Sequence, residues 1–274
     1  MRTNGWQAET ITALTGLLED DPTVRALVLF GSAASGMCDA WSDIDLLLVV
    51  DEQALWHFFP TLDWLQALGE VYAFEQFPQV HGGLTRVCFS DLRRLDFVIV
   101  CESFVAQQDW SAKLSGGAHP LFSRSAAVER LLATTQVQPP PRLIAPEEFE
   151  RMVQQFWYKA VMATTKVVRN DQLIALHLAL ELLQECCVLQ MLLRDRVSGT
   201  NQHRDGGIGN VFVAQLEGMP PVYNAASILD LVEQSSRLFD ALAGQWSDIY
   251  VERHTSLSTL LEQARRTLAD HTDL

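Results

Sequence analysis

Three consecutive prolines divide this chain into two parts that cannot share one helix or one central strand. Residues 138–142 (QPPPR) form a stiff, extended spacer, because proline has no backbone N–H and its ring fixes φ. Before this spacer, short β-type runs alternate with short helical stretches, and after it helical periodicity dominates. We therefore predict an α+β fold with a mixed sheet and helices in residues 1–138 and a helical bundle in residues 142–274.

The pattern of apolar residues predicts the individual elements. In the first part it indicates a helix with one apolar face, formed by Trp6, Ile11, Leu14, Leu17 and Leu18. Strands are expected at 23–30, 45–50, 85–89 and 95–100, with further helices at 53–68 and 125–132. The run after Asp45 (LLLVV) is uninterrupted, which is typical of a central strand covered on both faces. In the second part, helices are expected at 147–168, 173–194, 225–243 and 256–269.

The composition excludes several classes of protein. Hydrophobic residues make up 48% of the chain, as in globular proteins. With 34 acidic and 20 basic residues the formal net charge is −14, which disfavours general nucleic-acid binding and favours a metal ion or a cationic small substrate. The first residues are too polar for a signal peptide, and no uninterrupted apolar run reaches the roughly 18 residues that span a bilayer. The five cysteines form no CxxC pair. We expect a soluble, cytoplasmic protein with no nucleic-acid and no membrane partner.

Residues 31–49 (GSAASGMCDAWSDIDLLLV) carry the groups that point to chemistry. Gly31 and Ser32 follow a predicted strand and open a predicted helix, where backbone N–H groups and a small hydroxyl can hold a phosphate. In an extended segment Asp43 and Asp45 point to the same side, about 7 Å apart, and repel each other unless a cation lies between them. Mg²⁺, which prefers hard oxygen ligands, removes this conflict. The segment therefore predicts a site for a metal–nucleoside triphosphate.

A third carboxylate, Asp96, begins the apolar run at 97–100 (FVIV). An acidic side chain in such a run is costly unless something compensates its charge, and a metal does so. If this strand lies beside 45–50, three carboxylates converge and complete a two-metal site. The alternative is that Asp96 faces water at a strand edge or pairs with Arg93 or Arg94.

The pattern GS-x(9)-SDID followed by a hydrophobic strand resembles the nucleotidyltransferase superfamily whose palm is like that of DNA polymerase β. With its helical second part the chain looks most like the antibiotic nucleotidyltransferases that act on aminoglycosides and lincosamides. The resemblance implies a catalytic domain over 1–138, a substrate-binding bundle over 142–274, an NTP co-substrate and two Mg²⁺ ions. Carried onto this chain, Gly31 and Ser32 contact the triphosphate, and Asp43 and Asp45 bind both metals. Asp96 binds the catalytic metal or accepts the hydroxyl proton.

The resemblance and the motif together predict an Mg²⁺-dependent nucleotidyltransferase. It would transfer a nucleoside monophosphate, AMP in the first instance, to a hydroxyl of a small molecule and release pyrophosphate. The expected acceptors are aminoglycosides or lincosamides, and the acidic composition suits a cationic acceptor. Two alternatives stay open: a toxin–antitoxin-type nucleotidyltransferase that modifies a protein or RNA, and an inactive binding module on the same scaffold. The apolar stretches of the second part also allow a homodimer.

Charged residues of the second part are weaker candidates. Lys159 could reach the triphosphate, and Asp171 could act as a base toward the acceptor hydroxyl. For each, the favoured interpretation is structural: a solvated helix face, or an interhelical turn with a helix N-cap. Glu181 and Glu185 lie one turn apart in an otherwise apolar helix, so they line a cationic substrate pocket or form the exposed stripe of that helix.

Overall fold

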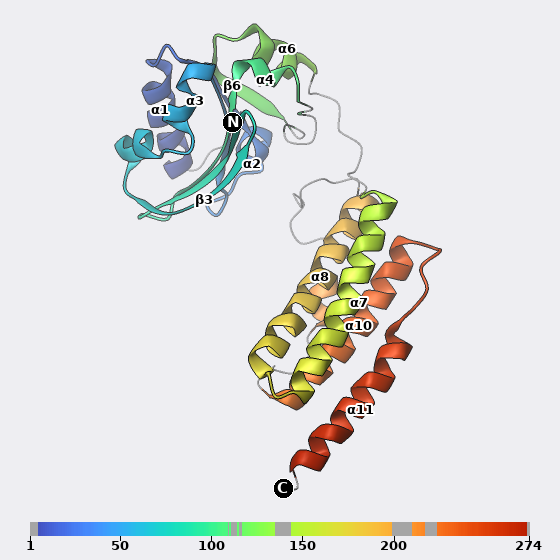
Figure 1. Ribbon diagram of the computed structural model, residues 1–274. Coiled ribbons are helices and arrows are strands. Elements are labelled where there is room, and N and C mark those ends of the chain that lie inside the picture. Colours follow the sequence, from blue (N-terminus) through green and yellow to red (C-terminus); the bar gives the residue numbers. More distant parts are fainter. Residues whose placement is uncertain are drawn as a thin grey trace. The chain divides into compact units, whose positions relative to one another are not determined.

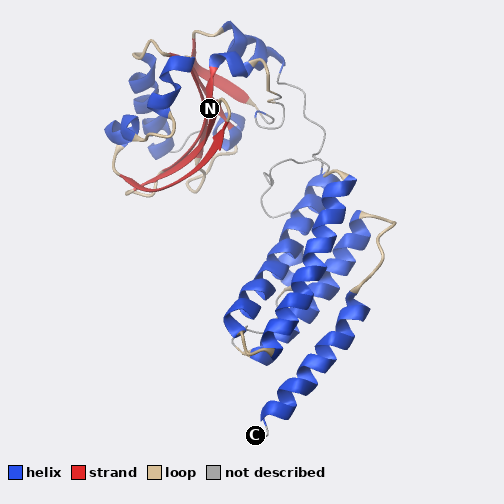
Figure 2. Ribbon diagram, in the orientation of Figure 1, coloured by secondary structure: helices blue, strands red, loops and turns tan. Residues whose placement is uncertain are grey.

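The computed structural model describes residues 5–108, 110, 114, 117–134, 144–198, 210–216 and 224–272. The chain divides into two compact units, Met1–Pro139 and Pro140–Leu274. The first combines a sheet with helices, and the described part of the second is helical (Figures 1 and 2). The predicted α+β class is therefore confirmed. The proline spacer itself lies outside the described residues.

The described part of the first unit contains a six-stranded mixed sheet with the strand order β3-β4-β5-β2-β1-β6. Its strands are β1 (Val24–Phe30), β2 (Ile44–Val50), β3 (Val71–Gln79), β4 (Gly82–Phe89), β5 (Arg94–Cys101) and β6 (Ala118–Ser123). The two central strands β2 and β5 are parallel, and the other neighbouring pairs are antiparallel. Strands β1, β2, β4 and β5 correspond to the four predicted strands, whereas the two edge strands β3 and β6 were not predicted.

Helices cover both faces of this sheet, which is why its central strands are apolar on both sides. The described helical elements of the unit are α1 (Gly5–Glu19), α2 (Gly31–Ser35), η1 (Glu52–Ala54), α3 (Leu55–Phe58), η2 (Asp63–Leu68), α4 (Glu102–Val105) and α6 (Ala126–Thr134). Leu46 and Phe97 share one buried cluster with residues of α1, α3 and η2. Leu47 and Val98 point the other way and share a second cluster with residues of α4 and α6. We call these the α1 face and the α6 face.

Two local predictions in the first unit are wrong. The single helix expected over 53–68 is replaced by η1, α3 and η2, because Pro60 cannot continue a helix and Phe59 before it is extended, with φ −149°. In α1, Leu17 is 37% exposed although it was expected on the apolar face, and Gln7 is fully buried. Gln7 is buried because its amide bonds to a loop near the candidate site, as described below.

The described part of the second unit is a bundle built on long helices. It contains α7 (Pro146–Val168), α8 (Gln172–Ser198), α9 (Asn210–Gln215), α10 (Ala225–Trp246) and α11 (His254–Thr272). The four long helices agree with the four predicted ones. In the core between α7 and α10 the rings of Phe156 and Phe239 stack with their centroids 3.8 Å apart.

Helix α8 is long and apolar enough to cross a membrane by length and composition alone, with a mean hydropathy of 1.5 over its most apolar window. The helix still contains no uninterrupted apolar run of that length, because His177, Glu181 and Glu185 lie within it. Ala175, Leu182 and Leu189 of this helix are fully buried in the cluster that α7 and α10 also form. One side of α8 therefore packs in the core of the bundle, whereas Leu173, Leu180 and Val197 on other sides are exposed.

A buried carboxylate fixes the segment between α10 and α11. Asp240 is 3% exposed and accepts hydrogen bonds from the Tyr250 hydroxyl at 2.6 Å and from the backbone N–H groups of Arg253 and His254 at 3.1 and 2.9 Å. The Nδ1 of His254 also lies 2.7 Å from its Oδ2. Burial and the hydrogen bond to Asp240 raise the pKa of Tyr250. These donors satisfy a carboxylate that burial would otherwise destabilise.

We expect Asp240→Ala to lower the free energy of unfolding of the second unit by about 3 kcal/mol, because it leaves several buried donors without an acceptor. Calorimetry of the second unit's transition in the full chain measures this loss. The control is Glu252→Ala, which removes an exposed neighbouring carboxylate and is expected to change the stability by less than about 0.5 kcal/mol. Equal losses in the two variants would contradict the prediction.

Candidate active site

The central parallel strands place two of the predicted carboxylates side by side. In the register of β2 and β5, Asp45 lies opposite Asp96. Neighbouring strands are spaced about 4.8 Å apart, so the two side chains start from adjacent positions on one face of the sheet. That face is the α6 face, because side chains alternate along a strand and Leu47 and Val98 point there. The predicted adjacency of the two strands is confirmed.

The third acidic residue of the motif lies at the same end of the strands. Asp43 precedes β2 by one residue and is partly buried, as are Asp45 and Asp96. Burial raises the pKa of Asp96, the negative charge of Asp43 raises it further, and Arg86 opposes both effects. The charge of Asp43 therefore acts directly on Asp96, as expected if the acidic residues gather at one place.

Asp96 is held by an arginine that the sequence analysis missed. Arg86 lies opposite Asp96 in the antiparallel pair of β4 and β5, and its Nε is 3.1 Å from Asp96 Oδ2. The alternative that Asp96 pairs with Arg93 or Arg94 is not what the structure shows. Arg93 bonds to Asp91 and the Leu68 carbonyl, and the Arg94 guanidinium donates to the Trp41 carbonyl. No local signal marks Arg86, because only the register of the strands brings it to Asp96.

A glycine brings the backbone into contact with the motif. Strand β1 ends at Phe30, which pairs with Asp45, and the chain then turns into α2 at Gly31 with a φ of +69°. A Cβ atom at this glycine would lie 1.9 Å from Asp45 Oδ2. The Asp45 carboxylate therefore packs directly against the backbone at the start of α2. Gly31 and Ser32 thus lie beside the acidic residues, and their contact with a triphosphate stays a prediction.

The loop between α2 and Asp43 is fixed from two directions. The buried Gln7 of α1 donates from Nε2 to the carbonyls of Asp39 at 2.8 Å and Ser42 at 3.2 Å. Within the loop, Asp39 Oδ1 accepts from the Trp41 N–H at 2.9 Å and from the Ser42 hydroxyl at 2.8 Å. From the other side, Arg94 of β5 donates to the Trp41 carbonyl. Helix α1 and strand β5 therefore together fix the loop that leads to Asp43. Sequence reasoning missed Gln7, because a polar residue on a helix gives no sign of a contact 32 residues away.

The candidates of the second unit form ion pairs within that unit. Lys159 Nζ pairs with Glu181 Oε2 at 2.8 Å and also with Glu185. Burial alone would lower the pKa of Lys159, but the hydrogen bonds to the two glutamates raise it. Asp171 Oδ2 lies 2.9 Å from Lys166 Nζ. The roles expected for Lys159, Asp171 and Glu181 toward nucleotide or acceptor stay predictions.

The donors of the motif suit a hard divalent cation. Asp43, Asp45 and Asp96 offer only carboxylate oxygens, which are the ligands that Mg²⁺ prefers. Their oxygens are not drawn tightly together. Among the described residues, one set of three metal-capable side chains has all its ligand atoms within 4.8 Å, and it is Asp240, Glu252 and His254 of the second unit. There Asp240 accepts hydrogen bonds from the start of α11, which already explains why these side chains lie close together.

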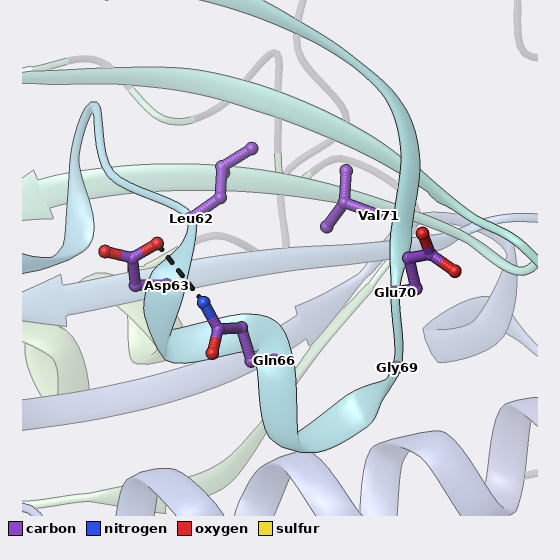
Figure 3. Close-up of a pocket in the computed structure, with 6 residues that line it drawn as sticks. All are labelled: Leu62, Asp63, Gln66, Gly69, Glu70 and Val71. Carbon is purple, nitrogen blue, oxygen red and sulfur yellow. Dashed lines mark hydrogen bonds between the residues drawn. The ribbon is translucent and has the colours of Figure 1, made fainter.

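A surface hollow of about 530 Å³ lies elsewhere on the first unit (Figure 3). It is lined by Leu62, Asp63, Gln66, Gly69, Glu70 and Val71. Two of these residues, both on η2, are joined by a hydrogen bond from Gln66 Nε2 to Asp63 Oδ1 at 3.4 Å (Figure 3). Leu62 and Val71 pack against the cluster on the α1 face, whereas Asp45 and Asp96 lie on the α6 face. The sheet therefore separates this hollow from the candidate active site.

The chain matches one protein family and is similar to several solved structures. Residues 1–203 match the model of the streptomycin adenylyltransferase family. An aminoglycoside 6-adenyltransferase structure from Bacillus subtilis is similar, with 13% identity, a TM-score of 0.36, and 97% of this chain and 99% of that chain covered. A spectinomycin adenyltransferase from Enterococcus faecialis, solved with ATP and spectinomycin, has 11% identity, a TM-score of 0.36, and 96% and 99% covered. A nucleotidyltransferase-like protein from Exiguobacterium sibiricum has 12% identity, a TM-score of 0.31, and 88% and 78% covered. No curated protein sequence shows a significant match.

Proposed function

Because the chain belongs to the streptomycin adenylyltransferase family and is therefore a nucleotidyltransferase, we propose that it transfers AMP from ATP to a hydroxyl of an aminoglycoside antibiotic. The observation that carries this proposal is the register of β2 and β5, which sets Asp45 beside Asp96. The chain turns into α2 at the same end of the sheet, where Gly31 contacts Asp45. Acidic groups and a helix start at one place suit a nucleoside triphosphate and its counter-ion.

The nucleotide would bind at the turn into α2. Backbone N–H groups there and the Ser32 hydroxyl would donate to phosphate oxygens, and Gly31 leaves room for their approach. Asp43, Asp45 and Asp96 would hold Mg²⁺, which when bound neutralises the triphosphate and makes the acceptor hydroxyl more acidic. We propose two ions, the number that the resemblance implies.

The transfer needs one proton acceptor, and we assign that role to Asp96. The acceptor oxygen forms a bond to the α-phosphorus, while the bond from that phosphorus to the bridging oxygen of the leaving pyrophosphate breaks. The hydroxyl proton goes to the Asp96 carboxylate. Asp96 Oδ2 accepts a hydrogen bond from Arg86 Nε, so Oδ1 is the oxygen that takes this proton.

The acceptor would bind through its positive charges. The chain carries a net charge of −14, which attracts a cationic aminoglycoside. In the second unit, Glu181 and Glu185 share the single ammonium of Lys159, so the three groups keep an excess of negative charge. We propose Glu181 and Asp171 as acceptor contacts. For Lys159 to contact the nucleotide, it would have to exchange a glutamate for a phosphate oxygen.

An acceptor panel tests this function. The protein is incubated with ATP, Mg²⁺ and either aminoglycosides, including streptomycin and spectinomycin, or lincosamides, and the products are weighed by mass spectrometry. We expect a gain of one adenylyl group on at least one aminoglycoside, with one pyrophosphate released for each product. A product from a lincosamide alone would move the assignment to that class.

Protein and RNA acceptors are included as a further arm of the same assay. Transfer to one of these and to no antibiotic would replace the small-molecule proposal. Asp63→Asn, which removes an aspartate on the α1 face, is run beside the wild type and is expected to give the same products at the same rate.

A further inference from the structure

We propose that Arg86 is a positioning residue for the transfer reaction, which holds one oxygen of the Asp96 carboxylate so that the other faces the reacting groups. The inference rests on the role proposed above for Asp96. It concerns a residue that neither the motif nor the comparisons single out. Three observations support it: the hydrogen bond from Arg86 to Asp96, the contacts of Arg86 with Glu75 and Phe77, and the order of the strands.

The first observation is a chain of charges across three strands. Arg86 lies opposite Asp96 of β5 on one side and opposite Glu75 of β3 on the other. Its Nε is 3.1 Å from Asp96 Oδ2, and its Nη1 is 3.2 Å from Glu75 Oε2. The side chains of Arg86 and Glu75 are 50% and 59% exposed, and ion pairs this exposed contribute little to stability. The pair with Glu75 therefore contributes little to the stability of the sheet, whereas Asp96, at 21% exposed, is the less accessible partner of Arg86.

The second observation is that the guanidinium is itself held in place. Its central carbon lies 5.6 Å from the centre of the Phe77 ring, on the neighbouring strand β3. The bond to Glu75 fixes one end of the planar group, and the ring supports its face. Because the guanidinium is rigid, these two contacts also fix the direction in which its Nε–H points. Arg86 can therefore set the orientation of the carboxylate that it contacts.

The third observation is the order of the strands. Strands β4 and β2 flank β5 on opposite sides. Arg86 on β4 binds Oδ2 of Asp96, and a carboxylate is planar, so its Oδ1 is directed by the same contact. The β2 side, where Asp45 lies, is the side that Arg86 does not occupy. Arg86 therefore orients Asp96 for work beside Asp45, as the partner of a ligating carboxylate commonly does.

Two variants of equal charge and similar shape separate orientation from simple charge compensation. In Arg86→Gln the amide nitrogen takes the place of Nε and can still donate to Asp96. In Arg86→Met a methyl group takes that place and donates nothing. If Arg86 acts only as a positive charge, the two variants behave alike. If it orients Asp96, we expect Arg86→Met to have a kcat roughly tenfold or more below that of Arg86→Gln, with similar KM values for ATP and acceptor.

A second readout does not depend on transfer. Mn²⁺ binding in the presence of a non-hydrolysable ATP analogue is measured from the electron paramagnetic resonance signal of free Mn²⁺. We expect Arg86→Met to bind Mn²⁺ roughly tenfold more weakly than Arg86→Gln. Adding Asp96→Asn to both variants should remove this difference, because the bond between the two residues is its cause. Arg237→Met, which breaks an exposed pair with Glu233 in α10, controls for loss of a surface arginine.

The outcomes distinguish the two proposals. Equal kcat and equal Mn²⁺ affinity in the two Arg86 variants of an active enzyme would overturn the positioning role and leave the proposed function intact. A difference in Mn²⁺ affinity that depends on Asp96, in a protein that adenylylates no acceptor, would support the positioning role and reject the proposed function. Equal Mn²⁺ affinity in a protein that adenylylates no acceptor would reject both proposals. A loss of kcat of the same size in Arg237→Met would also overturn the inference.

Discussion

We expect that replacing Asp45 by asparagine abolishes the proposed adenylyl transfer, with kcat falling by roughly a thousandfold or more, which corresponds to about 4 kcal/mol of lost transition-state stabilisation. Asparagine has the same shape but no negative charge, so it packs against Gly31 as before and no longer compensates a cation. The fold should be preserved, with a thermal midpoint within about 4 °C of the wild type. Initial rates of pyrophosphate release and a circular dichroism melt measure the two quantities.

Asp63→Asn supplies the comparison for this variant, since it makes the same chemical change on the other face of the sheet. Its rate should match that of the wild type. If Asp45→Asn keeps more than a tenth of the wild-type rate, the carboxylate is not needed for transfer and the assignment of the site is wrong.

Gly31→Ala is expected to cost the enzyme roughly a hundredfold in kcat, because a misplacement of about 1 Å in a catalytic group has effects of this size. The new Cβ would lie 1.9 Å from Asp45 Oδ2, so the carboxylate has to move. The positive φ of +69° adds a loss of stability of about 1–2 kcal/mol, since alanine disfavours this backbone conformation.

Gly36→Ala separates the two effects. Gly36 also has a positive φ, +76°, but nothing lies within 4 Å of the position of its Cβ. It should lose the same 1–2 kcal/mol or so of stability and keep its activity. Kinetics and unfolding are measured on both variants, and similar rates in the two would show that contact with Asp45 is unimportant.

The centre of the fold could be predicted because its residues carry strong local signals. The apolar runs of β2 and β5 are long and uninterrupted, and the four long helices of the bundle show helical periodicity. The edge strand β3 gives no such signal, because it exposes Tyr72 and Phe74 and contains Pro78. Strand β6 is also at an edge, and it contains Pro120. Edge strands are not buried on both faces, so they lack the continuous apolar run by which a central strand is recognised in the sequence.

The residues of the candidate site also fall into two groups, those with a local sequence signal and those without one. Asp43, Asp45, Gly31 and Ser32 stand within one short segment, and the spacing of such residues along the sequence is itself the signal. Arg86 and Gln7 act from other elements, on Asp96 and on the loop before Asp43. Their contacts depend on the order of the strands and on how α1 packs, which a single sequence does not specify. The candidate binding residues could therefore be named from the sequence, whereas the residues that contact and position them could not.

The alignment of β2 with β5 also determines where this chain can change its length. Deleting or inserting one residue between Arg94 and Asp96 would turn the Asp96 side chain to the opposite face of the sheet, because neighbouring positions of a strand point in opposite directions. An insertion after Val80, in the turn between β3 and β4, leaves the alignment of β2 with β5 unchanged. The neighbouring His81 is less suitable, because its carbonyl accepts a hydrogen bond from the Cys101 N–H of β5. Loop tips of this kind tolerate insertions. Engineered insertions for labels or linkers therefore belong at that turn.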